Sequence, residues 1–303
     1  MTEAFVAPRH ASLFVDNTRE RCLALIATGI WSGITRTDFL AWTNNFQGPD
    51  EQYFAACLLD ALIYRSTRQT NALCYQLLQR ALPDLCRENH ILHHADQEHW
   101  SGIRDLTSHP EIRLVSVVRD SDSPATSGPL VTRLFRETIR IDDELLIWPR
   151  ELIPAIERGA SCLVFLDDFL GTGAQFFEFA IQYDLQALSD AATLIYAPLV
   201  AHADGIEYLR GLLPTLYVCA AEHLDADHHI FSENSSPFED GTNTVQTARE
   251  FYQALLSRRR IAIPEAVTEG FGGLGLTYAF EHAVPDNSIP IFRTHSSWHP
   301  LFP

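Results

Sequence analysis

The sequence has 303 residues, of which 46% are hydrophobic and 11% aromatic, a composition typical of a globular protein with a substantial core. Its formal net charge of −17 disfavours non-specific nucleic-acid binding, because such binding depends on neutralising phosphates. All 22 basic residues are arginines. A Schiff-base lysine, a Walker-A lysine and pyridoxal-phosphate chemistry are therefore excluded, since each requires an amine.

Hydrophobic runs and cysteines bear on the location of the protein. No apolar run reaches the ~20 residues needed to span a bilayer. The first residues also lack the basic-then-apolar pattern of a secretory signal. The six cysteines are scattered without a CxxC pair, and most have apolar neighbours, which predicts buried free thiols in a reducing compartment. We therefore expect a cytoplasmic protein that does not contact the membrane.

The first hundred residues show helical periodicity. An apolar pattern begins at residues 23–30, and Thr37 and Asp38 cap a second helix, FLAWTNNF. Asp50 opens a third, EQYFAACLLDALIYRS, and Thr70 opens a fourth that stops near proline 83. The pattern predicts an all-α N-terminal domain over residues 1–100.

From about residue 112 the pattern changes to alternating strands and helices. Short apolar runs, typical of buried strands, are separated by helical segments of roughly 10–15 residues. This alternation predicts an α/β domain over residues 101–303, with a parallel sheet and helices on both faces. The predicted strands are 114–118, 163–166, 193–200 and 216–220. The segment from residue 270 to the end shows no regular pattern.

Residues 163–175 read LVFLDDFLGTGAQ and carry the clearest chemical signal. An apolar strand leads into Asp167 and Asp168, which places both acids at its carboxyl end, where open α/β sheets bind ligands. The small residues that follow expose backbone N–H groups at a helix N-terminus, an arrangement suited to phosphate. Because carboxylates accept hydrogen bonds from vicinal hydroxyls, the segment predicts a ribose-phosphate site. The alternative is a solvated strand end or an N-cap pair.

The loop of residues 119–128 follows the first predicted strand. Ser127 and Gly128 can present N–H groups to an anion, and Arg119 can pair with a diphosphate in a bidentate manner. Asp120 and Asp122 can hold Mg²⁺ through water, since Mg²⁺ prefers carboxylate and substrate oxygens. The alternative is a solvated loop in which Ser127 caps the next helix.

Residues 225–231 read DADHHIF and follow the fourth predicted strand. Their acids and histidines lie near a strand end, where they can approach the nucleobase side of a ligand. The alternative is a polar loop whose side chains are solvated.

The segment LVFLDDFLGTGAQ resembles the phosphoribosyl-pyrophosphate (PRPP) motif of type I phosphoribosyltransferases. Three further segments, ATSGPLVTRLFRE, PDNSIPIF and WHPLFP, together with WTNNF near the start, resemble the PRTase-CE family. These are phosphoribosyltransferase-like proteins of prokaryotic conflict systems. The resemblance covers most of the chain. It implies a type I phosphoribosyltransferase-like α/β fold and an effector or sensor role in antiphage defence, sometimes beside a retron reverse transcriptase.

The resemblance also implies roles for individual residues. Asp167 and Asp168 would hold the ribose hydroxyls, and the loop after the first strand would hold the diphosphate with Mg²⁺. The usual motif has hydroxyl residues at two loop positions where this chain has glycine and glutamine, which favours ligand binding over efficient turnover. The loop residues that would bind the 5′-phosphate are Gly171, Thr172, Gly173, Ala174 and Gln175.

Several functions agree with this pattern. The first is a phosphoribosyltransferase-like effector that binds PRPP or a related nucleotide and, if active, displaces a group at the ribose C1 carbon. Nearby carboxylates can stabilise the oxocarbenium-like transition state of such a reaction. The alternatives are a non-catalytic ligand sensor and a component of a defence complex that is bound to a protein or ribonucleoprotein partner. A homo-oligomer agrees with each of them.

Overall fold

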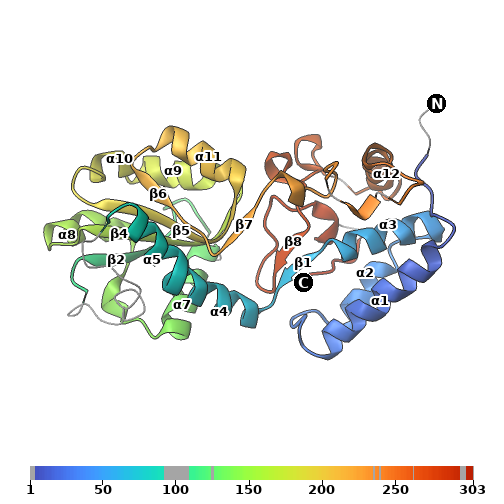
Figure 1. The fold of residues 1–303 in the computed structure, drawn as a ribbon, viewed down its shortest axis with the longest axis horizontal. Coiled ribbons are helices and arrows are strands. Elements are labelled where there is room, and N and C mark those ends of the chain that lie inside the picture. Colours follow the sequence, from blue (N-terminus) through green and yellow to red (C-terminus); the bar gives the residue numbers. More distant parts are fainter. Residues whose placement is uncertain are drawn as a thin grey trace. The chain divides into compact units, whose positions relative to one another are not determined.

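The computed structural model describes residues 4–91, 109–123, 126–234, 236–238, 240–261, 263–293 and 298–302. The chain forms two compact units (Figure 1). The terminal unit consists of Met1–Thr67 and Asp225–Pro303, and the central unit consists of Arg68–Leu224. This grouping differs from the sequence-based division at residue 100, because the C-terminal segment shares a hydrophobic core with the N-terminal helices.

The terminal unit is mainly helical. Thr35 and Asp38 form a capping box, so the second helix begins at Arg36, slightly before the predicted cap. Trp42 and Trp298 both donate their indole N–H groups to the Ile291 carbonyl oxygen, at 3.1 and 2.9 Å, which ties the two ends of the chain together. The helices are α1 (Ala11–Ala27), α2 (Arg36–Thr43), α3 (Gly48–Asp60) and α12 (Val245–Arg258).

The third helix is shorter than predicted, because a strand of a two-stranded parallel sheet follows it. That helix was expected to run to the end of LIYRS, but α3 ends at Asp60. Strand β1 (Ile63–Arg65) follows and pairs with β8 (Tyr278–Phe280), in the C-terminal segment for which no regular pattern was predicted. The β-branched and aromatic residues of β1 fit a strand, but its partner lies more than two hundred residues away in the sequence. Local periodicity therefore could not reveal the pairing.

The central unit holds the predicted parallel sheet, which confirms the α/β fold class. Its strands run in the order β3-β2-β4-β5-β6, all parallel, and β7 pairs with the end of β5. The strands are β2 (Ile112–Ser116), β3 (Leu146–Ile147), β4 (Cys162–Leu170), β5 (Thr193–His202), β6 (Leu216–Val218) and β7 (Glu222–Leu224).

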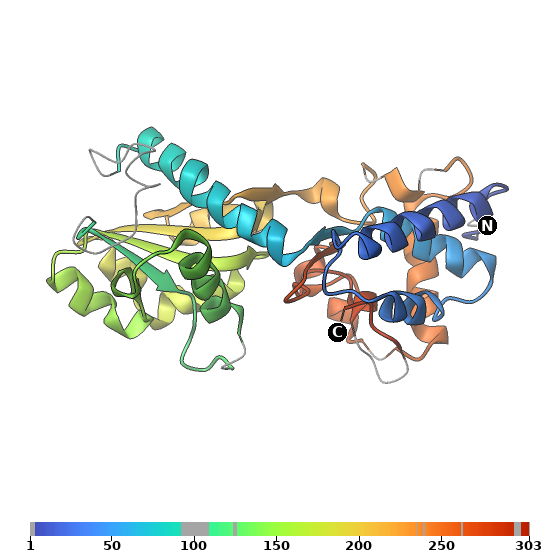
Figure 2. The same cartoon turned by 90° about the horizontal axis from the view of Figure 1, so that it is seen from below.

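Helices cover both faces of this sheet, with α9–α11 on one side and α5 and α7 on the other (Figures 1 and 2). Because both faces are buried, the central strands are almost continuously apolar. One long helical stretch runs past Pro83, where the predicted helix stopped, through a π-helical turn at Leu77–Ala81. The helices are α4 (Thr67–Gln76), α5 (Leu82–Glu88), α7 (Ser127–Ile139), α8 (Leu152–Glu157), α9 (Ala174–Gln182), α10 (Leu185–Leu188) and α11 (Ala203–Leu212).

The strand order creates a topological switch point. The chain passes from β2 to β3 on one side and then returns to β4 on the other side of β2. In open parallel sheets of this kind, ligands bind outside the carboxyl ends of the strands at the switch point. We therefore expect a ligand site at the carboxyl ends of β2 and β4. None of the helices in the described part of the chain is long and apolar enough to cross a membrane.

Candidate functional site

The paired acids lie inside β4 rather than after it. The predicted strand ended at residue 166, but Phe169 and Leu170 still pair with β5. Only 6% of Asp167 and 7% of Asp168 is exposed, so the pair is not a solvated strand end. Because side chains alternate along a strand, the two carboxylates leave opposite faces of the sheet.

Asp168 lies on the face covered by α7. The Ser127 hydroxyl, at the start of α7, donates to Asp168 Oδ1 at 2.9 Å. Gly128 packs directly on the end of β2, since a Cβ there would lie far inside the van der Waals distance of the Val117 carbonyl oxygen. Thr126 is the N-cap residue and makes no side-chain cap bond, so α7 begins without one at the switch point.

Asp167 lies on the opposite face of the sheet, where it contacts Tyr196 of the neighbouring strand β5. The Tyr196 hydroxyl donates to Asp167 Oδ2 at 2.9 Å, and the Asp168 N–H donates to Asp167 Oδ1 at 3.0 Å. Burial, and then the neighbouring Asp168 carboxylate, raise the pKa of Asp167 well above its usual value. Burial and the Asp167 charge likewise raise the pKa of Tyr196.

The raised pKa of Asp167 predicts how the Asp167→Asn variant responds to pH. Ionising this buried acid destabilises the folded state, so its cost is absent below the unfolded pKa of about 4 and grows as pH rises toward the folded pKa. We expect Asp167→Asn to raise the free energy of unfolding at neutral pH, and the gain to shrink as pH falls toward about 4. Urea unfolding of both proteins across this pH range measures the difference. A gain that is constant with pH would contradict the assignment.

The loop after β4 depends on close backbone packing. Gly173 has a φ of +85°, the left-handed region that favours glycine, and is the N-cap residue of α9 without a side-chain cap bond. A Cβ on Gly173 would lie 2.9 Å from Tyr208 Cδ1 of α11. Thr172 is half-buried and Gln175 is exposed. With its positive dipole end and first-turn N–H groups, the start of α9 is suited to an anion.

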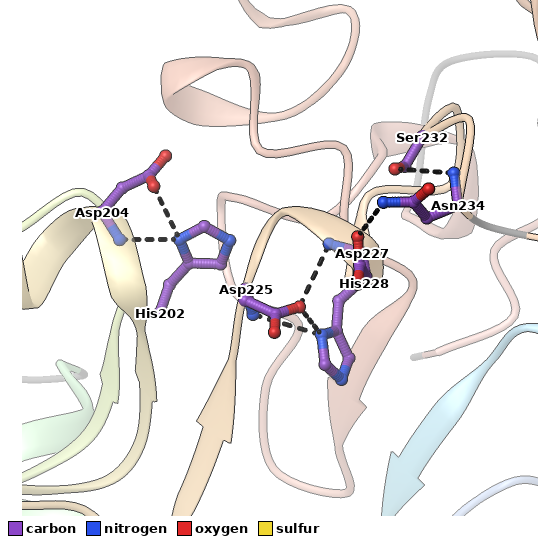
Figure 3. A network of polar contacts seen from close by, with 7 residues as sticks. All are labelled: His202, Asp204, Asp225, Asp227, His228, Ser232 and Asn234. Atoms are coloured by element: carbon purple, nitrogen blue, oxygen red, sulfur yellow. Dashed lines mark hydrogen bonds and ion pairs between the residues drawn. The ribbon is translucent and has the colours of Figure 1, made fainter.

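Helix α11 supports this loop from the next strand. His202, the last residue of β5, accepts a hydrogen bond at Nδ1 from the Asp204 N–H at 3.2 Å and so caps α11 (Figure 3). A Cβ on Gly205 would overlap the Gly171 carbonyl oxygen and lie 2.9 Å from Leu170 Cδ1. The glycine therefore lets α11 contact the loop backbone directly.

The loop after β2 holds its charged residues in ion pairs. Arg119 donates to Asp122 from its backbone N–H at 2.8 Å and from Nε at 2.9 Å, and it also pairs with Glu178. Partial burial acts to raise the pKa of Asp122, but the hydrogen bonds from Arg119 outweigh it and lower the pKa. Asp120 is exposed and accepts from the Tyr183 hydroxyl at 3.1 Å.

The magnesium assignment to Asp120 and Asp122 stays a prediction. Among the residues that the structure describes, no group of three or more His, Cys, Asp or Glu side chains could hold a metal. Of the two acids, Asp120 fits Mg²⁺ better, since Asp122 already carries two hydrogen bonds from Arg119. Mg²⁺ bound mainly by substrate phosphates and water needs only one or two protein carboxylates.

The DADHHIF segment forms a local capping network in the terminal unit (Figure 3). Asp225 accepts from the Asp227 N–H at 3.1 Å and contacts His228 Nδ1 at 2.8 Å. Asn234 donates to Asp227 Oδ1 at 2.8 Å. These contacts shape a short 3-10 helix at Ala226–His228 and agree with the polar-loop alternative.

The comparisons with known proteins bear on most of the chain. The PRTase-CE family model matches residues 39–303, which covers the switch point and both helices that begin there. The chain belongs to the PRTase-CE family. This confirms the resemblance found in the sequence and makes the chain phosphoribosyltransferase-like. No curated protein and no solved structure matches it.

One residue at the candidate site of this PRTase-CE protein was missed in the sequence. Tyr196 lies in the middle of TLIYAPLV, which reads as an ordinary buried strand. The available signal was a polar hydroxyl within an apolar strand that follows the strand with the two acids. In the β4–β5 register Tyr196 pairs with Phe165, two residues before Asp167 and on the same face.

Proposed function

We propose that this PRTase-CE family member binds PRPP or a related ribose-phosphate nucleotide, with Mg²⁺, at the carboxyl ends of β2 and β4. One observation carries the proposal: the Ser127–Asp168 hydrogen bond joins the start of α7 to the strand that leads into α9. The start of α7 and a carboxylate thus lie together at the switch point, and the strand that carries the carboxylate leads through a short loop into the start of α9. That combination suits a ligand with anionic groups and hydroxyls.

Each part of the ligand has a matching group in this proposal. The first N–H groups of α9 and the loop from Gly171 to Gln175 bind the 5′-phosphate, and the Asp167–Asp168 pair provides the carboxylate that accepts from the ribose hydroxyls. The start of α7 at Ser127 and Gly128 faces the diphosphate. Since the chain has no lysine and Arg119 is paired with two acids, Mg²⁺ supplies the positive charge that the diphosphate needs.

The binding proposal predicts the effect of removing one charge. We expect Asp168→Asn to weaken the binding of PRPP with Mg²⁺ at least about tenfold, because hydrogen bonds to a charged group contribute roughly 1.5–3 kcal/mol. Isothermal titration calorimetry measures this change. The matched control is Asp190→Asn, which removes the same charge from an exposed position. Asp190 lies just before β5, at the amino ends of the strands and away from the candidate site. Equal affinity of the two variants would refute the site.

A second function is a ligand sensor without turnover. It is favoured by the loop sequence, in which Thr172 is the only side-chain hydroxyl between Gly171 and Gln175. A sensor binds PRPP but releases no pyrophosphate with any nucleobase, whereas a transferase releases it. A pyrophosphate-release assay across the common bases separates the two.

The cellular role follows from the resemblance to conflict-system proteins. We propose a cytoplasmic component of antiphage defence, which acts alone, as a homo-oligomer, or with a protein or ribonucleoprotein partner such as a retron. All six cysteines are buried and none forms a disulfide, which agrees with a reducing compartment. Purification from cells that carry the neighbouring genes, followed by analysis of bound protein and nucleic acid, tests the partner.

A further inference from the structure

Tyr196 contacts two parts of the candidate site at once. Its hydroxyl reaches Asp167 on β4, and its ring stacks on Phe176 in the first turn of α9, with the ring centroids 3.7 Å apart and the planes inclined by 18°. Only 1% of the Tyr196 side chain is exposed. The residue therefore connects the acidic strand to the helix that begins after the loop.

Asp167 is engaged on both carboxylate oxygens. Oδ1 accepts from the Asp168 N–H and Oδ2 accepts from Tyr196. The side chain is directed to the sheet face opposite Ser127 and α7, and it is buried. To reach Asp167, of which only 6% is exposed, a ribose hydroxyl would have to enter the face of the sheet on which Tyr196 packs against Phe176.

We propose that Tyr196 is a positioning residue of the ribose-phosphate site. It holds Asp167 within the sheet and fixes the first turn of α9. Asp168 is then the only one of the two acids that contacts the ligand. This inference rests on the proposed function and narrows it. The two adjacent acids then have separate tasks: Asp168 faces the ligand with Ser127, and Asp167 fixes the strand and loop through Tyr196.

The binding test compares conservative variants of the two acids. Asp167→Asn keeps a hydrogen bond at both positions, since its carbonyl oxygen can accept from the Asp168 N–H while its amide donates to the Tyr196 oxygen, which reverses the direction of that bond. We expect Asp167→Asn to bind PRPP with Mg²⁺ within about threefold of the wild type, whereas Asp168→Asn loses at least about tenfold. Equal losses in the two variants would overturn the inference and leave the proposed function intact.

The positioning role is tested on the ligand-free protein. Tyr196→Phe keeps the ring but removes the hydroxyl, and Tyr75→Phe is the matched control, because Tyr75 donates at 2.7 Å to the Thr138 carbonyl oxygen elsewhere in the central unit. We expect Tyr196→Phe to speed amide hydrogen exchange in residues 171–177 and to weaken PRPP binding about fivefold to tenfold, while Tyr75→Phe changes neither.

The two measurements separate the ways in which the account can fail. Unchanged exchange and unchanged affinity in a folded Tyr196→Phe protein would refute the positioning role. If the wild type binds no PRPP even at high concentration, the proposed function and the ligand contact of Asp168 are both refuted. The exchange measurement then still decides whether Tyr196 fixes the loop.

Discussion

Replacing Gly205 with alanine is expected to destabilise the central unit and to weaken ligand binding, whereas the same change at Gly211 is expected to stabilise it. Both glycines lie on α11. A Cβ on Gly205 overlaps the Gly171 carbonyl oxygen and presses on Leu170, but a Cβ on Gly211 has no atom within 4 Å. Alanine stabilises a helix by roughly 1 kcal/mol relative to glycine. Since both variants share this gain, the expected difference in their stability comes from the overlap at Gly205 alone.

The overlap must be relieved by moving the loop, because the obstacle is backbone rather than a flexible side chain. We expect Gly205→Ala to cost about 1–3 kcal/mol of unfolding free energy, as overpacked sites do, and to lower PRPP affinity more than about tenfold. Urea unfolding and calorimetry on both variants measure these effects. Equal stabilisation by the two alanines would show that α11 does not support the loop.

Replacing Trp42 with alanine is expected to have the largest effect on the terminal unit. Trp42 is fully buried, stacks on Phe292 with centroids 5.7 Å apart, and donates to the Ile291 carbonyl oxygen. Its truncation leaves a cavity between an N-terminal helix and the C-terminal segment, at a cost of about 3–5 kcal/mol.

The control for this variant is Leu13→Ala on α1, where 62% of the side chain is exposed. We expect this change to cost less than about 0.5 kcal/mol, as surface substitutions usually do. Urea unfolding measures both. If Trp42→Ala were as stable as Leu13→Ala, the C-terminal segment would not share a core with the N-terminal helices.

The sequence was sufficient for the features that depend on local patterns. The apolar runs around residues 114 and 163 predicted two strands of a parallel sheet, and the DDFLGTGAQ motif placed Asp167 and Asp168 near the carboxyl end of the second strand. The family match and the sheet confirm the fold class. Local signals worked here because each element is a contiguous segment with its own periodicity.

Features that depend on distant partners were not predictable. Phe169 and Leu170 extend β4 because β5 offers them partners, and β1 is a strand only because β8 pairs with it. The tasks of the two acids depend on Ser127 and Tyr196, whose hydroxyls reach β4 from other parts of the chain. Such contacts follow from tertiary packing, which residue spacing alone does not encode.

A crystal structure of the protein with PRPP and Mg²⁺ tests the central claim most directly. We expect density for the 5′-phosphate within hydrogen-bond distance of the backbone N–H groups of residues 171–175, and a ribose hydroxyl on Asp168. A ligand bound elsewhere while this loop remains empty would contradict the account.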